Sequence, residues 1–355
     1  MDDVFSRCGR IAQLVEQLTL NQRVLGSSPS ASTNYSQIIN ELRSRPARFF
    51  GTPYILGTFQ SNSRLLPTSY TAPFRQPEWS ALALIESPQF VSAVHRAYVE
   101  AGADVITTNS YALVPFHIGA ERFATEGASL AARAGRLARE LADASPRAVR
   151  VAGSLPPVCG SYRPDLVDLD RARPILEILI GALAPNVDHW LAETLSSLAE
   201  ARLCATLTAP TGKALWLSFT LEDEAATNEP ALRSGESVAE AARLAQEVGA
   251  AALLFNCSQP EVMEAAVRSA QAQLGADSAT RLGVYANAFP PMAADAEANS
   301  GLSPIREDLT PEGYGRFAAA WHAAGASILG GCCGIGPEHI ANLRESARNG
   351  SAIQS

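Results

Sequence analysis

One unit recurs along most of this 355-residue chain: a helix with a polar start, a short turn of alanine and glycine, and then a brief apolar strand. In one copy, Pro88 begins a helix with an apolar face, and the strand Asp104–Asn109 follows. The same order precedes two further strands, Ala251–Asn256 and Ala326–Gly330, after helices whose starts are capped by Ser237 and Thr310. The repeat therefore predicts alternating helices and strands.

Other short apolar segments extend this pattern to eight strands. The remaining five candidates are Tyr54–Thr58, Ala148–Ser154, Asp188–Glu193, Ala214–Thr220 and Arg281–Asn287. Short apolar strands separated by helical sequence are typical of a parallel sheet that is buried on both faces. We expect an α/β fold in which residues 48–355 form one closed (βα)8 barrel of the TIM type. A doubly wound open sheet is the alternative, but no glycine-rich phosphate loop follows the first strand.

Residues 1–47 differ from the rest, because they are rich in Gln, Asn and Ser and include a Ser-rich run at 26–32. We interpret them as an N-terminal appendage, either disordered or upstream of the true translation start. The alternative is a short amphipathic helix that docks on the domain. Its apolar face would consist of Ile11, Leu14, Val15 and Leu18.

Charge and cysteine content exclude several classes of protein. The formal net charge is −8, and no window approaches the roughly 18 consecutive apolar residues of a membrane-spanning helix. Nucleic acid and membranes are therefore not the expected partners, which leaves small molecules. Six scattered cysteines do not form a disulfide framework, and the N-terminus lacks an apolar secretory core. We expect free thiols and a cytoplasmic location.

The strongest chemical motif is Gly330-Gly331-Cys332-Cys333-Gly334, directly after the last predicted strand. Its glycines relax the backbone, so that two neighbouring side chains can converge. Cys257 ends another strand and would lie at the same rim of a barrel. Three thiolates with an open fourth position are typical of a catalytic zinc, since a structural zinc normally has four ligands. The alternative is that these are small buried residues in tight turns.

A zinc ion with three thiolates is a poor generator of hydroxide, but it can hold one more sulfur ligand. Coordination lowers the pKa of a thiol, and the electron-rich site leaves that sulfur nucleophilic. The motif therefore predicts alkyl transfer to a small thiol. Cys204 lies in helical sequence and is expected in the core, and Cys159 is at most a loop neighbour of the site. No histidine has the spacing of a metal ligand.

These residues resemble the homocysteine S-methyltransferases, zinc-dependent barrels that methylate homocysteine to methionine. The resemblance runs from about Trp79 to Ile340 and depends on four segments: 101–111 (AGADVITTNSY), Glu193-Thr194, Phe255-Asn256-Cys257 and 330–334 (GGCCG). It implies that Cys257, Cys332 and Cys333 bind zinc, that Glu193 holds the amino group of the substrate, and that Asn109 and Asn256 line the rim. All six fall at carboxyl ends of predicted strands, where barrels of this type keep their active sites.

One departure concerns the first strand. The family opens this strand with an Asp-Gly pair, whose Asp helps to bind the amino acid, whereas the aligned residues here are Pro53-Tyr54. The thiol chemistry is therefore better supported than the identity of the thiol. Nothing after Ile340 is long enough for a cobalamin or folate module, which favours a small donor such as S-methylmethionine or S-adenosylmethionine. The rival hypotheses are a barrel that methylates another thiol, a noncatalytic paralogue, and a metal-storage or redox protein.

Overall fold

The computed structural model describes residues 53–57, 78, 80–223, 230–291 and 305–352. The predicted appendage, residues 1–47, lies outside these ranges, and its interpretation stays a prediction. Within the described ranges, no helix has both the length and the apolar character needed to cross a membrane.

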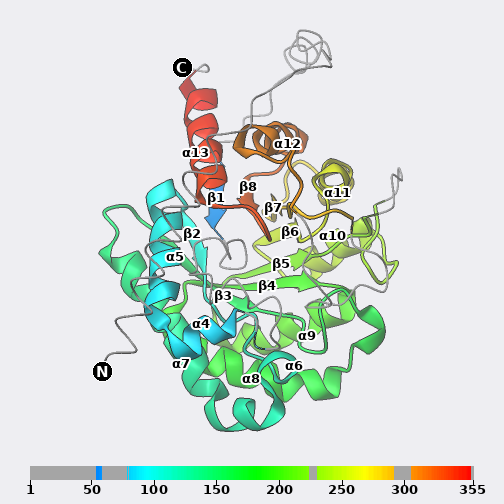
Figure 1. The fold of residues 1–355 in the computed structure, drawn as a ribbon. Coiled ribbons are helices and arrows are strands. Elements are labelled where there is room, and N and C mark those ends of the chain that lie inside the picture. Colours follow the sequence, from blue (N-terminus) through cyan, green and yellow to red (C-terminus); the bar gives the residue numbers. More distant parts are fainter. Residues whose placement is uncertain (1–52, 58–77, 79, 224–229, 292–304, 353–355) are drawn as a thin grey trace. The chain divides into compact units, whose positions relative to one another are not determined.

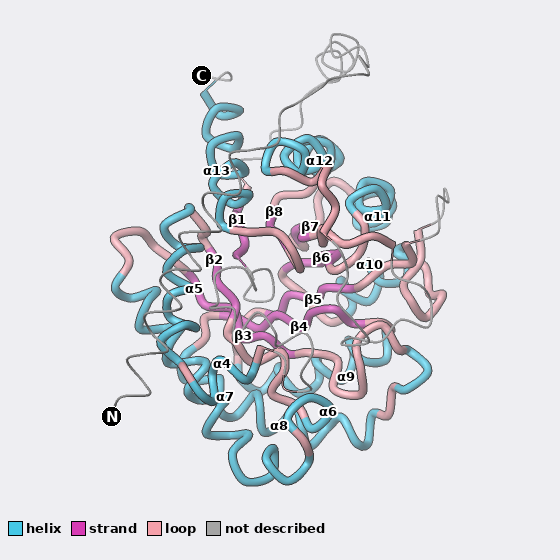
Figure 2. Tube along the Cα trace, in the orientation of Figure 1, coloured by secondary structure: helices cyan, strands magenta, loops and turns pink. Residues whose placement is uncertain are grey.

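Eight parallel strands pair in chain order and close on themselves, β8 against β1 (Figures 1 and 2). The strands are β1 (Tyr54–Gly57), β2 (Val105–Thr107), β3 (Arg150–Leu155), β4 (His189–Leu195), β5 (Leu215–Phe219), β6 (Ala252–Asn256), β7 (Arg281–Tyr285) and β8 (Ile328–Gly331). Each coincides with one of the eight predicted strands. The predicted closed barrel is confirmed, and the open sheet is excluded.

Helices surround the barrel (Figure 1). They are α4 (Ala81–Glu86), α5 (Pro88–Ala101), α6 (Pro115–Ile118), α7 (Ala120–Ala144), α8 (Leu169–Leu183), α9 (Leu198–Thr208), α10 (Val238–Glu247), α11 (Pro260–Leu274), α12 (Pro311–Ala324) and α13 (Pro337–Ala352). Short 3₁₀ turns occupy Pro164–Leu166, Ala184–Asn186 and Ala209–Thr211. The helix starts follow the predicted chemistry, because Ser237 forms a capping box with Glu240, and the Thr310 side chain accepts a bond from the Gly313 amide.

The apolar core has two layers. The larger layer lies between the outward faces of the strands and the helices, and includes Trp190 and Trp321. The smaller layer fills the barrel with inward side chains such as Leu56, Leu191 and Leu254. The barrel is therefore a packed core, and room for polar groups remains only at its two ends.

Candidate active site

Three thiols meet at the carboxyl end of the barrel. Cys257 follows β6 directly, and Cys332 and Cys333 follow β8. The three sulfur atoms lie within 4.8 Å of one another, and the Sγ atoms of Cys257 and Cys333 are 3.9 Å apart. All three side chains are buried. The structure thus brings together the cysteines that the sequence predicted to meet.

The backbone around the cluster explains why these thiols converge. Cys257 has a φ of 52°, in the left-handed region that non-glycine residues rarely adopt, and this turns its side chain away from the direction of a regular strand. A Cβ atom on Gly330 would lie 2.5 Å from the carbonyl oxygen of Leu56, so that only glycine fits there. The amide of Cys332 donates to the carbonyl of Ala286, 2.8 Å away, which anchors the turn on the loop after β7.

The thiols influence one another strongly. Hydrogen bonds from the other two cysteines hold the pKa of Cys257 well below its usual range. Burial raises the pKa of Cys332, and the neighbouring Cys257 raises that of Cys333. Negative charge on one sulfur therefore disfavours negative charge on its two neighbours.

The donor set fits a soft divalent metal. Zinc–sulfur bonds of about 2.3 Å in a tetrahedral arrangement place sulfur atoms roughly 3.8 Å apart. The distance of 3.9 Å between Cys257 and Cys333 agrees with that spacing, and the 4.8 Å limit leaves Cys332 within reach of the same ion. Among the residues that the structure describes, this is the only group of three or more Cys, His, Asp or Glu side chains that is arranged to hold a metal.

Glu193 brings a carboxylate into the same end of the barrel. It lies in β4, and the pairing register of β4 with β5 shifts between Ala192 and Leu195. Its carboxylate accepts hydrogen bonds from the Ser154 hydroxyl at 2.5 Å and from the Tyr285 hydroxyl at 3.3 Å. Only 1% of Glu193 is exposed, and this burial raises its pKa to about 7. A buried acid with two hydroxyl donors is ready to receive a cationic group.

Asn256 connects the Glu193 segment to the thiols. Its Oδ1 accepts from the amide of Thr194 at 3.0 Å and from the hydroxyl of Ser218 at 2.7 Å. Its Nδ2 donates to Thr194 Oγ1 at 2.8 Å and makes a longer contact of 4.0 Å with Cys332 Sγ. Thr194 has a φ of 61°, which is costly for a β-branched residue. Asn256 thus holds a strained turn in place, and its amide already has protein partners on both atoms.

Asn109 follows β2 and is buried, but its amide donates to the carbonyl of Ser80 at 3.2 Å. That bond ties the loop after β2 to the segment before α4. The neighbouring Ser110 donates to the carbonyl of Ser154, whose hydroxyl reaches Glu193. Asn109 is therefore placed to support the rim, and its side-chain hydrogen bond to another described residue leads to Ser80 and not to the thiols.

The sequence did not identify three aromatic residues near the thiols. Tyr285 bonds Glu193, Tyr162 lies against Cys257, and Tyr111 bonds the Ser161 hydroxyl at 2.6 Å. Burial raises the pKa of each tyrosine well above its usual range, so that all three are neutral hydrogen-bonding groups. Two of them lay in segments that the sequence singled out, since Tyr285 belongs to a predicted strand and Tyr111 ends the segment 101–111.

The structure corrects the expectation for the first strand. Pro53 precedes β1, and Tyr54 is its first residue, paired with Ile328 at the amino end of the barrel. An acid at either position would lie at the end of the barrel opposite the thiols. The residue at the carboxyl end of β1 is Gly57, whose Cβ position is filled by Tyr98. The absence of an acid at Pro53-Tyr54 is therefore no evidence about the substrate site.

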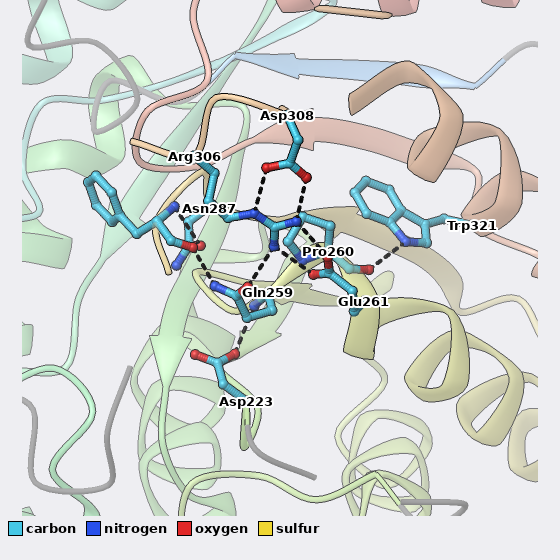
Figure 3. A network of polar contacts seen from close by, with 9 residues as sticks. Asp223, Gln259, Pro260, Glu261, Asn287, Arg306, Asp308 and Trp321 are labelled. Atoms are coloured by element: carbon cyan, nitrogen blue, oxygen red, sulfur yellow. Dashed lines mark hydrogen bonds and ion pairs between the residues drawn. The ribbon is translucent and has the colours of Figure 1, made fainter. Parts of the chain in front are cut away.

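A polar network holds the loops around Cys257 (Figure 3). Arg306, in the loop between β7 and α12, donates to Asp308, Glu261 and Gln259. The amide of Gln259, two residues after Cys257, donates to Asp223 at 2.8 Å. Asp223 in turn forms an ion pair of 3.0 Å with Arg233, which is fully buried with it. Loops after β5, β6 and β7 are thereby fixed to one another beside the thiols.

Comparisons with known proteins agree with this geometry. Residues 62–347 match the family model described as homocysteine S-methyltransferase. The chain is 31% identical over 294 residues to the homocysteine S-methyltransferase of Escherichia coli (strain K12), covering 75% of this chain and 87% of that protein. It is 29% identical over 295 residues to homocysteine S-methyltransferase 1 of Brassica oleracea var. italica. That match covers 76% of this chain and 86% of that protein.

Among solved structures, the metallated form of the homocysteine methyltransferase MmuM from Escherichia coli matches with a TM-score of 0.63 and 26% identity. The match covers 86% of this chain and 98% of that one. The oxidised form of the same protein matches with a TM-score of 0.65. The chain therefore belongs to the homocysteine S-methyltransferase family, and it is a methyltransferase.

Proposed function

We propose that this protein transfers a methyl group from a small sulfonium donor, S-methylmethionine or S-adenosylmethionine, to the thiol of homocysteine, and that it requires zinc. The observation that carries the proposal is the cluster of three buried thiols beside a buried carboxylate. Membership in the family supports methyl transfer to homocysteine. The metallated form of the related MmuM supports a metal at such a site.

Cys257, Cys332 and Cys333 would hold the zinc. When bound, the ion would lower the pKa of the substrate thiol and keep its sulfur nucleophilic at neutral pH. The three cysteines themselves would stay thiolate and leave the fourth direction to the substrate. Because they come from two different turns, the cluster depends on the closed barrel and not on one local motif.

Glu193 would orient the substrate through its amino group. An ammonium ion removed from water needs an anionic partner, and a nearby positive charge lowers the pKa of a buried carboxyl from the value of about 7 that burial causes. Ser154 and Tyr285 hold the carboxylate from two sides, so that the ammonium would meet it in a fixed direction.

The chemical step is a substitution at the methyl carbon. The substrate thiol first gives up its proton to solvent. A sulfur electron pair then forms the new C–S bond, while the bond between the methyl group and the donor sulfonium breaks and leaves its electrons on a neutral thioether. Methionine is the product on the acceptor side. The positive donor is favoured near the buried acid and thiols, since opposite charge attracts it to this rim.

The test is a turnover screen of the metal-loaded protein with each donor and with homocysteine or 3-mercaptopropionate. We expect methionine from homocysteine with at least one sulfonium donor, and loss of turnover after chelation that zinc restores. A protein that binds zinc through these cysteines but methylates no thiol would instead favour metal storage. Turnover that survives complete removal of the metal would exclude the zinc requirement.

A further inference from the structure

A second polar site lies at the amino end of the barrel, opposite the thiols. A cavity of about 310 Å³ is lined there by Arg150, His189 and Arg281, the first residues of β3, β4 and β7. Trp216 of β5 and Asp188 also line it. The methyl-transfer site uses none of these residues. The volume is at the lower end of the range for small-molecule pockets, about 300–1,000 Å³.

The cavity has an excess of positive charge. Arg281 donates to the hydroxyl and to the backbone carbonyl of Ser327, and both acceptors are neutral. Its guanidinium carbon lies 4.2 Å from the centre of the Tyr54 ring. Arg150 lies 5.8 Å from the same ring, and its guanidinium has no hydrogen bond or ion pair with any residue that the structure describes. Within the described part of the chain, neither arginine is therefore neutralised by a carboxylate.

The one acid at the cavity already has partners. Asp188 accepts two hydrogen bonds of 3.0 Å from Arg139 and one of 2.7 Å from the amide of Val151. Its charge is balanced by Arg139, which is not a lining residue. Arg150 and Arg281 together consequently leave about two positive charges for a ligand.

The side chain of His189 is a second, independent indication that the cavity binds a ligand. Only 3% of it is exposed, and its ring lies 4.2 Å from that of Trp216. Neither ring nitrogen has a hydrogen-bond partner among the residues that the structure describes. Buried polar groups normally have partners, and leaving one without costs about 1–3 kcal/mol. Burial lowers the pKa of His189 to about 4, so that at neutral pH the ring offers one N–H donor to the cavity.

We infer that this cavity is a binding site for a phosphate group, carried by inorganic phosphate or by a small phosphomonoester. Two guanidinium groups and one imidazole N–H converge from three strands, and guanidinium groups match phosphate oxygens well. A phosphomonoester carries about −1.5 to −2 charges at neutral pH, which balances the two arginines, whereas a carboxylate supplies one. The site is independent of the methyl-transfer reaction.

Calorimetry on the full-length protein, at constant ionic strength, tests this inference with inorganic phosphate, O-phosphoserine and acetate. We expect saturable binding of one phosphate per chain and at least tenfold weaker binding of acetate. Tighter binding of O-phosphoserine than of inorganic phosphate would identify an ester ligand, and equal binding would identify free phosphate. Acetate that binds as tightly as both, or the absence of any binding, would overturn the inference.

Arg150→Gln is the decisive variant, because Arg150 is exposed and its guanidinium has no hydrogen bond or ion pair with another described residue. It should weaken phosphate binding at least tenfold and leave methyl transfer unchanged. Arg268→Gln, on the exposed face of α11, removes the same charge elsewhere and should change neither property. The imidazole NMR signals of His189 should shift with phosphate in the wild type. Unchanged binding in Arg150→Gln, or His189 signals that do not respond, would exclude the site.

Discussion

The two ends of this barrel share the same eight strands and have opposite chemistry. The carboxyl end holds three thiols and Glu193, whereas the amino end holds Arg150, His189 and Arg281. Burial shifts the ionisable groups in opposite directions, raising the pKa of Glu193 to about 7 and lowering that of His189 to about 4. The comparison shows that burial in one scaffold disfavours the charged form of an acid at one end and of a base at the other.

Backbone strain also separates the two ends. In the described part of the chain, the non-glycine residues with positive φ are Tyr162, Thr194 and Cys257, all near the thiols. Such conformations cost on the order of 1–3 kcal/mol each and persist only where surrounding contacts enforce them. Asn256 accepts a bond from the backbone of Thr194, and the backbone of Gln259 holds the turn after Cys257. The carboxyl end is therefore built for a fixed arrangement of side chains.

The largest expected effect is at the thiols. Cys332→Ser should abolish metal retention after a chelator challenge and lower kcat/KM on the order of 10³-fold or more, because a metal ion contributes several kcal/mol to such chemistry. Metal content measured by mass spectrometry and methionine formation are the two readouts.

Cys159→Ser is the matched control for that variant, since Cys159 is a half-buried loop residue outside the cluster. It should keep both metal and activity. Equal metal content in Cys332→Ser, Cys333→Ser and the wild type would contradict a metal site at the carboxyl end. Most of the proposed chemical difference between the two ends would then be lost.

The barrel could be predicted from the sequence because its strongest signal is a local pattern. That pattern consists of eight short apolar strands, several of which follow helices that begin at residues such as Ser237 and Thr310. The thiols were predictable for a related reason: parallel strands end at the same rim, so Cys257 and Cys332 had to meet once the barrel closed. The amino end was not predictable, because Arg150, His189 and Arg281 occupy ordinary positions at strand starts. Their convergence depends on the register around the barrel.

Pro53-Tyr54 shows how sequence alignment fails without that register. The pair was matched to an acidic position of the family by its distance from Gly57, and the structure puts it at the other end of the strand. Asn256 was expected to line the rim, which stays a prediction, and the structure adds that its amide holds the turn at Thr194. Which of several polar side chains faces a substrate depends on hydrogen bonds that a linear pattern does not contain.

Substrate selection should depend on Glu193. Glu193→Gln should raise the KM for homocysteine by about 30-fold to several thousand-fold, because removing the partner of a buried ammonium costs on the order of 2–5 kcal/mol. Bound metal should stay at the wild-type level. Turnover of 3-mercaptopropionate, which lacks an amino group, should change little. An equal loss for both thiols would mean that Glu193 supports the metal or the fold instead.

The pH dependence of stability should have opposite signs at the two ends. His189 stays neutral when folded, so its contribution is complete above its ordinary pKa of 6.5 and is lost as the pH falls toward 4. Glu193 stays protonated when folded, so its contribution is complete below 4.5 and is lost as the pH rises toward 7. Each effect is on the order of 3 kcal/mol, because the pKa of Glu193 rises from 4.5 to about 7 and that of His189 falls from 6.5 to about 4.

Denaturant unfolding of metal-free protein at pH 4.5, 5.5 and 7 measures these two contributions. Relative to the wild type, His189→Gln should lose stability mainly at the higher pH values, and Glu193→Gln should lose it mainly at the lower ones. Glu200 and His95, whose pKa values are also shifted by burial, contribute equally to all three proteins and cancel in the differences. Parallel curves for the two variants would contradict the proposed opposition.

The smallest expected effect concerns residues 1–44. Deletion of residues 1–44 should leave metal content, the KM for homocysteine and phosphate affinity unchanged. The reason is that β1 starts at Tyr54, and the Ser-rich part of that segment has little apolar area to bury. The melting temperature should move by no more than about 2 °C, the size of a surface change of a few tenths of a kcal/mol.

A fall of many degrees would show that the segment packs on the barrel through the apolar face of Ile11, Leu14, Val15 and Leu18. A change in phosphate affinity alone would show that residues 1–44 contribute to the phosphate site. In that case the barrel would form the thiol site by itself, whereas the phosphate site would also need residues from outside the barrel.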